Sequence, residues 1–207
     1  MIRLLISLVV LTMLLVPARA ETLTILAFGD SLTAGYGLPP EQAFPVKLEA
    51  ALRAKGHDVT IINGGVSGDT AGDGLARLEW SLSDEVDGVI VELGANDALR
   101  GLEPQQAEQA LDGILAVLAG RNLPALVAGM MAPPNLGADY GIAFDGMYSR
   151  LAGKHGALLF PFFLAGVAAD PKLNQADGLH PTGEGVDVIV ARMLPFVEEL
   201  LTKAAVK

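Results

Sequence analysis

Short apolar runs rich in β-branched and aliphatic residues recur along the chain, and segments with apolar residues at helical spacing separate them. This alternation is typical of an α/β domain, in which helices cover both faces of a parallel sheet. The predicted strands are Leu23–Phe28, Val59–Ile62, Gly88–Leu93, Ala125–Met130 and Ala157–Phe160. The predicted helices are Glu41–Lys55, Ala71–Leu82, Pro104–Ala119, Tyr140–His155 and Thr182–Lys203. We therefore predict one domain with a five-stranded parallel sheet.

The first 20 residues follow a different pattern. Arg3 precedes an apolar run, Leu4 to Val16, which ends in Pro17 and the small-residue pattern Ala18-Arg19-Ala20. This arrangement predicts a signal peptide at residues 1–20, cleaved after Ala20, and a periplasmic or secreted domain at residues 21–207. The alternative is an uncleaved membrane anchor, but the run of about 13 residues is shorter than the roughly 20 that span a bilayer.

Composition narrows the classes of partner. The chain has no cysteine, which excludes disulfides and the lipid-anchored form of the signal. Without Arg3 and Arg19, 12 Lys and Arg residues remain against 24 Asp and Glu, a net charge of −12 for the predicted mature chain. Such a surface argues against nucleic acid and anionic lipid, because both need a basic patch. Clustered metal ligands and the glycine motifs of nucleotide-binding loops are also missing, so we predict no metal and no cofactor.

The polar loops of the predicted sheet should meet at one edge, because ligands of such sheets bind beyond the carboxyl ends of the strands. The loops at this edge begin at Gly29, Asn63, Gly94 and Met131, and we expect the loop before His180 to join them. The segment Met131–Gly137 is rich in small and apolar residues. It predicts either one wall of a pocket or a plain turn-rich connection.

A serine at this edge is a candidate nucleophile. Ser31 directly follows the first strand, in Phe28-Gly29-Asp30-Ser31-Leu32, where a glycine allows a tight bend. A serine hydroxyl needs a base to take its proton, usually a histidine that a carboxylate orients. The alternative interpretation is that Asp30 or Ser31 only caps a helix.

Of the three histidines, His180 is the candidate base. It lies in the loop Asp177-Gly178-Leu179-His180-Pro181, where Pro181 disfavours helical geometry and Gly178 lets Asp177 reach the imidazole ring. The alternative is an aspartate turn before the last helix. We expect His57 and His155 to be surface residues away from this edge.

Two further loops carry hydrogen-bond donors for the charge that develops on a carbonyl oxygen. The glycines of Asn63–Thr70 allow backbone N–H groups to approach a ligand, and Gly94-Ala95-Asn96-Asp97 carries a side-chain amide. Glycine and asparagine turns are also common without a function.

Four blocks in this order resemble the GDSL, or SGNH, hydrolases, and within them the bacterial thioesterase and lysophospholipase branch. The blocks are Phe28-Gly29-Asp30-Ser31-Leu32, Ser67-Gly68-Asp69-Thr70, Gly94-Ala95-Asn96-Asp97 and Asp177-Gly178-Leu179-His180. The resemblance implies a flavodoxin-like three-layer α/β/α sandwich. It also implies Ser31 as nucleophile, Asp177 and His180 as its triad partners, and an oxyanion hole formed by the Ser31 and Gly68 backbone N–H groups and the Asn96 side chain.

The resemblance extends to Val91–Gly101, which matches an active-site loop that is mobile in the family; the sequence does not show whether Ala98–Leu102 moves in this chain. Two stretches depart from the family: Gly64-Gly65 stands where bulkier residues are expected, and Met130–Tyr140 differs in its prolines. We expect both to shape the acyl or alcohol pocket, so acyl-chain preference is not carried over.

The resemblance therefore implies hydrolysis of small-molecule carboxylic esters or thioesters through an acyl-enzyme on Ser31. We expect no stable membrane insertion after signal cleavage; a monomer is expected, although the sequence does not fix the oligomeric state. The alternative within enzymes is a carbohydrate O-deacetylase. The alternative of another class is a catalytically silent periplasmic binding module that keeps the fold.

Overall fold

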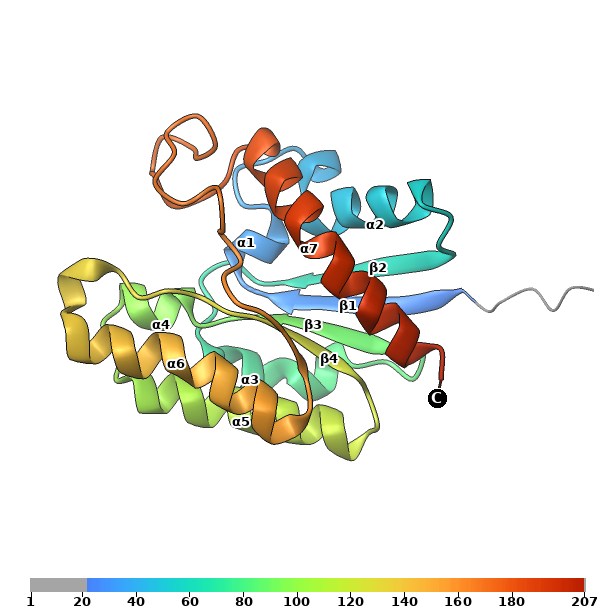
Figure 1. Ribbon diagram of the computed structural model, residues 1–207, viewed down its shortest axis with the longest axis horizontal. Coiled ribbons are helices and arrows are strands. Elements are labelled where there is room, and N and C mark those ends of the chain that lie inside the picture. Colours follow the sequence, from blue (N-terminus) through green and yellow to red (C-terminus); the bar gives the residue numbers. More distant parts are fainter. Residues whose placement is uncertain (1–21, 207) are drawn as a thin grey trace, which may run out of the picture.

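The computed structural model describes residues 22–206, so the predicted signal peptide lies outside the described residues. Five parallel strands form one sheet in the order β2-β1-β3-β4-β5 (Figure 1). They are β1 (Leu23–Gly29), β2 (Val59–Gly65), β3 (Gly88–Glu92), β4 (Ala125–Ala128) and β5 (Leu158–Phe160). The strand order reverses beside β1, since the chain adds β2 on one side and then crosses to β3 on the other. Ligands bind at such a reversal, beyond the carboxyl ends of the strands.

Helices cover both faces of the sheet. They are α1 (Ser31–Ala34), α2 (Phe44–Ala54), α3 (Ala71–Ser81), α4 (Ala95–Leu99), α5 (Pro104–Gly120), α6 (Ala138–His155) and α7 (Gly183–Ala204), with 3₁₀ turns at Pro40–Gln42 and Pro134–Leu136. In Figure 1, α2 and α7 lie on one face and α3, α5 and α6 on the other. The predicted α/β/α sandwich with five parallel strands is confirmed.

The core explains why the strands read as unbroken apolar runs. Ile25–Phe28 and every residue of β3 and β4 are buried, because helices pack on both sides of them. Burying one such aliphatic or aromatic side chain contributes roughly 1.5–3 kcal/mol. The buried strands therefore anchor the loops that begin at the carboxyl edge of the sheet.

The predicted elements are present, with shifted ends. The second strand runs on from Ile62 to Gly65, and the helix predicted from Glu41 begins at Phe44 after a 3₁₀ turn. The helices α1 and α4 were not predicted, because four or five residues are too few to show a helical period. Both lie at the carboxyl edge, directly after β1 and β3. Within residues 22–206, no helix is both long and apolar enough to span a bilayer.

Candidate active site

Ser31 is the first residue of α1, at the carboxyl end of β1. Asp30 is the N-cap of this short helix, and its Oδ1 accepts a hydrogen bond from the Leu32 backbone N–H at 2.9 Å. A side chain at Gly29 would collide with Thr33 and with the Glu92 backbone, so the turn needs a glycine. Asp30 therefore caps a helix, and the cap presents the Ser31 hydroxyl at the sheet edge.

Three side chains form one hydrogen-bonded chain at this edge. The Ser31 Oγ lies 2.9 Å from His180 Nε2, and His180 Nδ1 lies 2.6 Å from Asp177 Oδ2. The other carboxylate oxygen of Asp177 accepts the backbone N–H groups of Leu179 (2.9 Å) and His180 (3.0 Å). The predicted turn at Gly178 is present, with φ +70°. The structure thus brings together the serine, histidine and carboxylate that the sequence predicted.

The charge on Asp177 is stabilised by this turn. Hydrogen bonds from the His180 backbone, the His180 ring and the Leu179 backbone lower the pKa of the Asp177 carboxyl to about 2. An ionised Asp177 holds Nδ1 of the imidazole as a donor, and this leaves Nε2 to accept the Ser31 proton. The ring of Tyr36 packs against the His180 ring, with centroids 4.6 Å apart.

Two backbone donors lie beside Ser31. The N–H groups of Ser31 and Gly68 donate to no acceptor within residues 22–206. Gly68 has φ +91°, a conformation that favours glycine, and its carbonyl accepts a hydrogen bond from Arg100 Nη2 at 2.6 Å. Ser31, Gly68 and Asn96 all line the same pocket.

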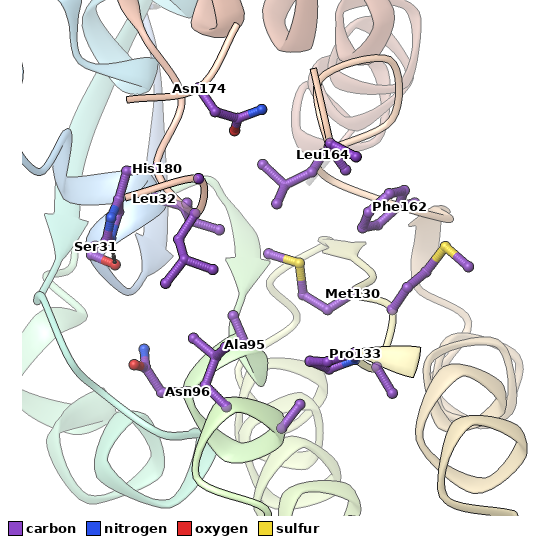
Figure 2. Close-up of a pocket in the computed structure, with 18 of the residues that line it drawn as sticks. Ser31, Leu32, Ala95, Asn96, Met130, Pro133, Phe162, Leu164, Asn174 and His180 are labelled. Carbon is purple, nitrogen blue, oxygen red and sulfur yellow. Dashed lines mark hydrogen bonds between the residues drawn. The ribbon is translucent and has the colours of Figure 1, made fainter. Parts of the chain in front are cut away.

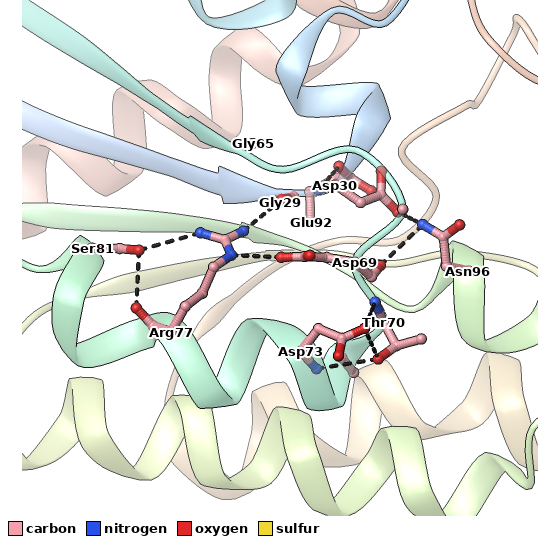
Figure 3. Close-up of polar contacts among 12 residues, drawn as sticks. Gly29, Asp30, Gly65, Asp69, Thr70, Asp73, Arg77, Ser81, Glu92 and Asn96 are labelled. Carbon is pink, nitrogen blue, oxygen red and sulfur yellow. Dashed lines mark hydrogen bonds and ion pairs between the residues drawn. The ribbon is translucent and has the colours of Figure 1, made fainter.

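The third predicted donor, the Asn96 side chain, is already engaged. Its Nδ2 donates to Asp30 Oδ2 and to the Asp69 carbonyl, each at 3.0 Å (Figure 3). Asp69 is itself held by Arg77, whose Nε lies 2.5 Å from Asp69 Oδ2 and whose Nη2 donates to the Gly29 carbonyl at 2.9 Å. The amide therefore sits in a network that joins the first three sequence blocks.

A cavity of about 730 Å³ opens next to Ser31 and His180 (Figure 2). Its walls are mostly aliphatic or aromatic and include Leu32, Leu99, Met130, Phe162, Leu164 and Leu179. None of the lining residues is Asp, Glu, Lys or Arg. A pocket of this size and chemistry suits an uncharged, largely apolar ligand.

Met131–Pro134, the first four residues of the predicted segment Met131–Gly137, line this cavity, so the pocket-wall interpretation is confirmed for them; the segment continues as a 3₁₀ turn at Pro134–Leu136. The expectation that Gly64 and Gly65 shape the pocket is wrong, since neither lines it. A side chain at Gly65 would collide with the Ala34 backbone and lie 2.8 Å from the Asp30 carbonyl. These two positions are thus small because β2 packs closely against α1 and β1.

This arrangement has known counterparts. The model of the GDSL-like lipase/acylhydrolase family matches residues 27–188. The chain belongs to this family. An arylesterase from Vibrio mimicus is 39% identical and aligns over 100% of this chain and 99% of its own length. Thioesterase 1/protease 1/lysophospholipase L1 from Escherichia coli (strain K12) is 38% identical over 89% of this chain and 86% of its own.

A solved structure supports the same family assignment. The crystal structure of AlinE4, an SGNH-hydrolase family esterase, superposes with a TM-score of 0.74 at 51% identity, covering 89% of this chain and 99% of that one. This GDSL-family chain is therefore an enzyme, an ester hydrolase, and the silent binding module is not supported.

Behind Ser31, this hydrolase buries two carboxyl groups side by side. Asp30 and Glu92 are both fully buried at the ends of neighbouring strands, and the Asp30 N–H lies 3.4 Å from Glu92 Oε2. The same oxygen accepts the Thr33 hydroxyl at 2.8 Å. Burial raises the pKa of Asp30 to about 6, and burial followed by the Asp30 charge raises the pKa of Glu92 well above its ordinary value.

The other two histidines lie away from this site, as predicted. His57 pairs with Glu198 at 3.0 Å near the amino end of β1, and His155 pairs with Asp112 at 2.6 Å near the amino end of β5. Neither contacts a serine among the described residues. His155 is more enclosed than a surface residue, with 12% of its side chain exposed.

Sequence reasoning did not single out several residues that organise this site. Glu92 had a usable signal, because a carboxylate inside the apolar run Gly88–Leu93 predicts a buried acid. Arg77 and Arg100 had none, since Arg77 reaches the Gly29 carbonyl and Arg100 the Gly68 carbonyl, 48 and 32 positions away. Asn174, which lines the cavity, lies in an irregular stretch with no periodicity to mark it.

Proposed function

We propose that Ser31 is the nucleophile of this ester and thioester hydrolase, His180 is its general base, and Asp177 orients the base. The observation that carries the proposal is the hydrogen-bonded chain Ser31 Oγ to His180 Nε2 (2.9 Å) and His180 Nδ1 to Asp177 Oδ2 (2.6 Å) at the mouth of an apolar cavity. A serine, a histidine and an ionised carboxylate in this order activate the hydroxyl for attack on an acyl carbon.

In the first half of the reaction, the Ser31 oxygen attacks the substrate's carbonyl carbon while His180 Nε2 takes the Ser31 proton. The tetrahedral intermediate collapses, the alcohol or thiol leaves with the proton from His180, and the acyl group stays on Ser31. In the second half, water gives a proton to His180 and attacks the acyl carbon. The carboxylic acid leaves, and the proton returns to the Ser31 oxygen.

The charge on the tetrahedral oxygen needs donors that are in place beforehand. The Ser31 and Gly68 N–H groups are available, since neither donates to another acceptor within residues 22–206. Asn96 can act as a third donor only by sharing the hydrogen it now gives to the Asp69 carbonyl. The Asp30 bond, in contrast, can stay and hold the amide in place.

The cavity points to acyl chains longer than acetyl. Its volume of about 730 Å³ falls in the range that encloses drug-sized ligands, and its lining is apolar and uncharged. A hydrocarbon chain gains roughly 0.8 kcal/mol for each CH₂ that it buries. The mostly apolar lining of the cavity does not suit the polar surface of a carbohydrate, so we do not propose the O-deacetylase.

The first test is hydrolysis of p-nitrophenyl esters from acetyl to palmitoyl by the purified protein, with Ser31→Ala as the matched control. We expect wild type to cleave medium-length chains fastest and the variant to lose all turnover while keeping its melting temperature. Equal activity of the two proteins would show that Ser31 is not the nucleophile. A wild type active on acetyl alone would instead favour the deacetylase.

We further propose that residues 1–20 are a cleaved export signal and that the enzyme works in the periplasm or outside the cell. Arg3, the apolar run from Leu4 to Val16 and the pattern Ala18-Arg19-Ala20 support this. Expression of the full chain in a bacterium with two membranes, followed by fractionation and N-terminal sequencing, tests it. The exported protein should begin at Glu21, and Ala20→Arg should block cleavage. Full-length protein in the cytoplasm would contradict the proposal.

A further inference from the structure

One polar side chain stands apart in the cavity wall. Most polar groups of the lining belong to the catalytic edge, namely Ser31, Ser67, Asn96 and His180. Asn174 lies elsewhere: in Figure 2 it faces the cavity from the wall opposite Ala95 and Asn96, with its oxygen toward the interior and Leu164 beside it. It is 94% buried, at 6% exposure.

The orientation of this amide is fixed by its neighbours. Both hydrogens of Nδ2 are used, because Nδ2 donates to the Val167 carbonyl at 2.7 Å and to the Asp170 carbonyl at 2.8 Å. A flipped amide would place its oxygen against two carbonyl oxygens. The backbone is also held, since Asn174 N donates to the Asp170 carbonyl at 3.1 Å and Asn174 bridges to Pro181, next to the base. The side-chain oxygen therefore has one position.

That oxygen accepts no hydrogen bond from residues 22–206. Among the described residues, Glu92 Oε1 is the one side-chain N or O atom that is both fully buried and without a partner. Asn174 Oδ1 also has no partner, so it is not fully buried. Oδ1 of Asn174 is thus an accessible acceptor in an apolar wall. An apolar ligand group that covers it leaves it unpaired, which costs about 1–3 kcal/mol, whereas a ligand donor satisfies it.

We propose that Asn174 selects acyl chains that carry a hydroxyl group, whose O–H donates to Asn174 Oδ1. The proposal rests on the proposed function of Ser31 and names the substrate class of that same site. The donor group of the ligand is neutral, because no charged side chain lines the cavity to balance an ammonium group. The rest of the chain packs against the aliphatic walls. Asn174 is then a specificity-determining residue, separate from the triad.

Wild type alone gives the first test. The substrates are p-nitrophenyl octanoate and its 3-hydroxy, 7-hydroxy and 8-hydroxy analogues, which share one leaving group. A fixed acceptor reaches one part of the chain, so kcat/KM for one hydroxy isomer should exceed that of the other two by about tenfold, the equivalent of one hydrogen bond. Isomers of equal kcat/KM would overturn the proposal, and they would mean that Oδ1 is satisfied by water only.

The variant Asn174→Leu gives the second test, and the ratio of kcat/KM between hydroxy and plain ester is the readout. Damage to the loop lowers both rates alike, but loss of the acceptor lowers the ratio about tenfold for the preferred isomer. Leu164→Met is the matched control in the same wall and should leave the ratio unchanged. An unchanged ratio in Asn174→Leu would overturn the proposal. If wild type cleaves the plain ester and Ser31→Ala does not, the proposed function holds even where the Asn174 proposal fails. If wild type cleaves no ester, the proposed function has failed.

Discussion

The side-chain amide of Asn96 donates to the carboxylate of Asp30 at 3.0 Å, so the residue that precedes the nucleophile also holds a candidate oxyanion donor. Asp30 uses its two oxygens for different helices: Oδ1 accepts Leu32 N at the start of α1, and Oδ2 accepts Asn96 Nδ2 on α4. The buried Asp30 carboxylate thus positions both the start of α1, which carries Ser31, and the side-chain amide of Asn96.

The first prediction concerns Asp30→Asn. Asparagine offers one oxygen in place of two, so either the α1 cap or the Asn96 contact loses its acceptor. We expect kcat to fall about 10–100-fold with little change in KM, because the loss affects the donor position and not ground-state binding. Steady-state kinetics on one p-nitrophenyl ester, with melting temperatures recorded alongside, measures the split between kcat and KM.

A double-mutant cycle separates this role from general damage. Asn96→Ala should cost about 10²–10³ in kcat, as removal of an oxyanion donor does. If Asp30 acts through Asn96, the double variant should be hardly slower than Asn96→Ala alone. If the losses in kcat of the two single variants multiply in the double variant, Asp30 supports the site by a route other than Asn96.

The second prediction uses the buried pair of Asp30 and Glu92. Their pKa values are raised in the folded protein, to about 6 for Asp30 and well above the ordinary value for Glu92, so the fold binds these protons more tightly than the unfolded chain does. Their contribution to stability is therefore complete below about pH 4 and is lost as the pH rises through the folded-state pKa values. Unfolding should need more urea at pH 5 than at pH 8.

The variant Glu92→Gln isolates one member of this pair. Glutamine has nearly the same shape and cannot ionise, so the gap in unfolding free energy between pH 5 and pH 8 should be smaller in the variant than in wild type. Comparison with wild type removes the contribution of all other titrating groups. A variant with the full pH dependence of wild type would mean that Glu92 does not titrate in this range.

The sequence predicted the sheet and the pairing of Asp177 with His180 because each depends on local pattern. Ser31 lies 149 positions from His180, and only the expected sheet edge and the resemblance in four sequence blocks joined it to that pair. Apolar runs mark buried strands, and the spacing from Asp177 to His180 is short enough for one turn to join them. The network behind Ser31 could not be predicted in the same way. The contacts of Arg77 with Gly29 and of Asn96 with Asp30 link residues 48 and 66 positions apart, and only the strand order β2-β1-β3 brings them together.

The third prediction compares two glycines. A methyl group at Gly65 would collide with the Ala34 backbone, and α1, which carries Ser31, would have to shift. Gly65→Ala should lower the unfolding free energy by about 1–3 kcal/mol and also lower kcat.

Gly141 lies inside α6 with nothing within 4 Å of the added carbon, so Gly141→Ala should stabilise the protein by about 0.5–1 kcal/mol with kcat unchanged. Urea unfolding and kinetics on both variants check this, and equal effects would contradict the packing argument.

The last prediction is for Asp177→Asn. The amide can no longer accept from His180 Nδ1 as an anion, and the imidazole loses the interaction that keeps Nε2 directed at Ser31. We expect kcat to fall about 10²–10⁴-fold. Glu184→Gln is the matched control, since it removes one exposed negative charge four residues beyond His180, and it should keep wild-type activity.

The same variant tests the ionisation of Asp177. Its pKa is lowered to about 2 in the folded protein, against 3.8 ordinarily, so its contribution to stability is present above about pH 4 and is lost as the pH falls toward 2. Wild type should therefore lose stability over this range more steeply than Asp177→Asn does. Acid unfolding curves of equal steepness would show that the turn does not favour the charged carboxylate, and the orienting role of Asp177 would then rest on geometry alone.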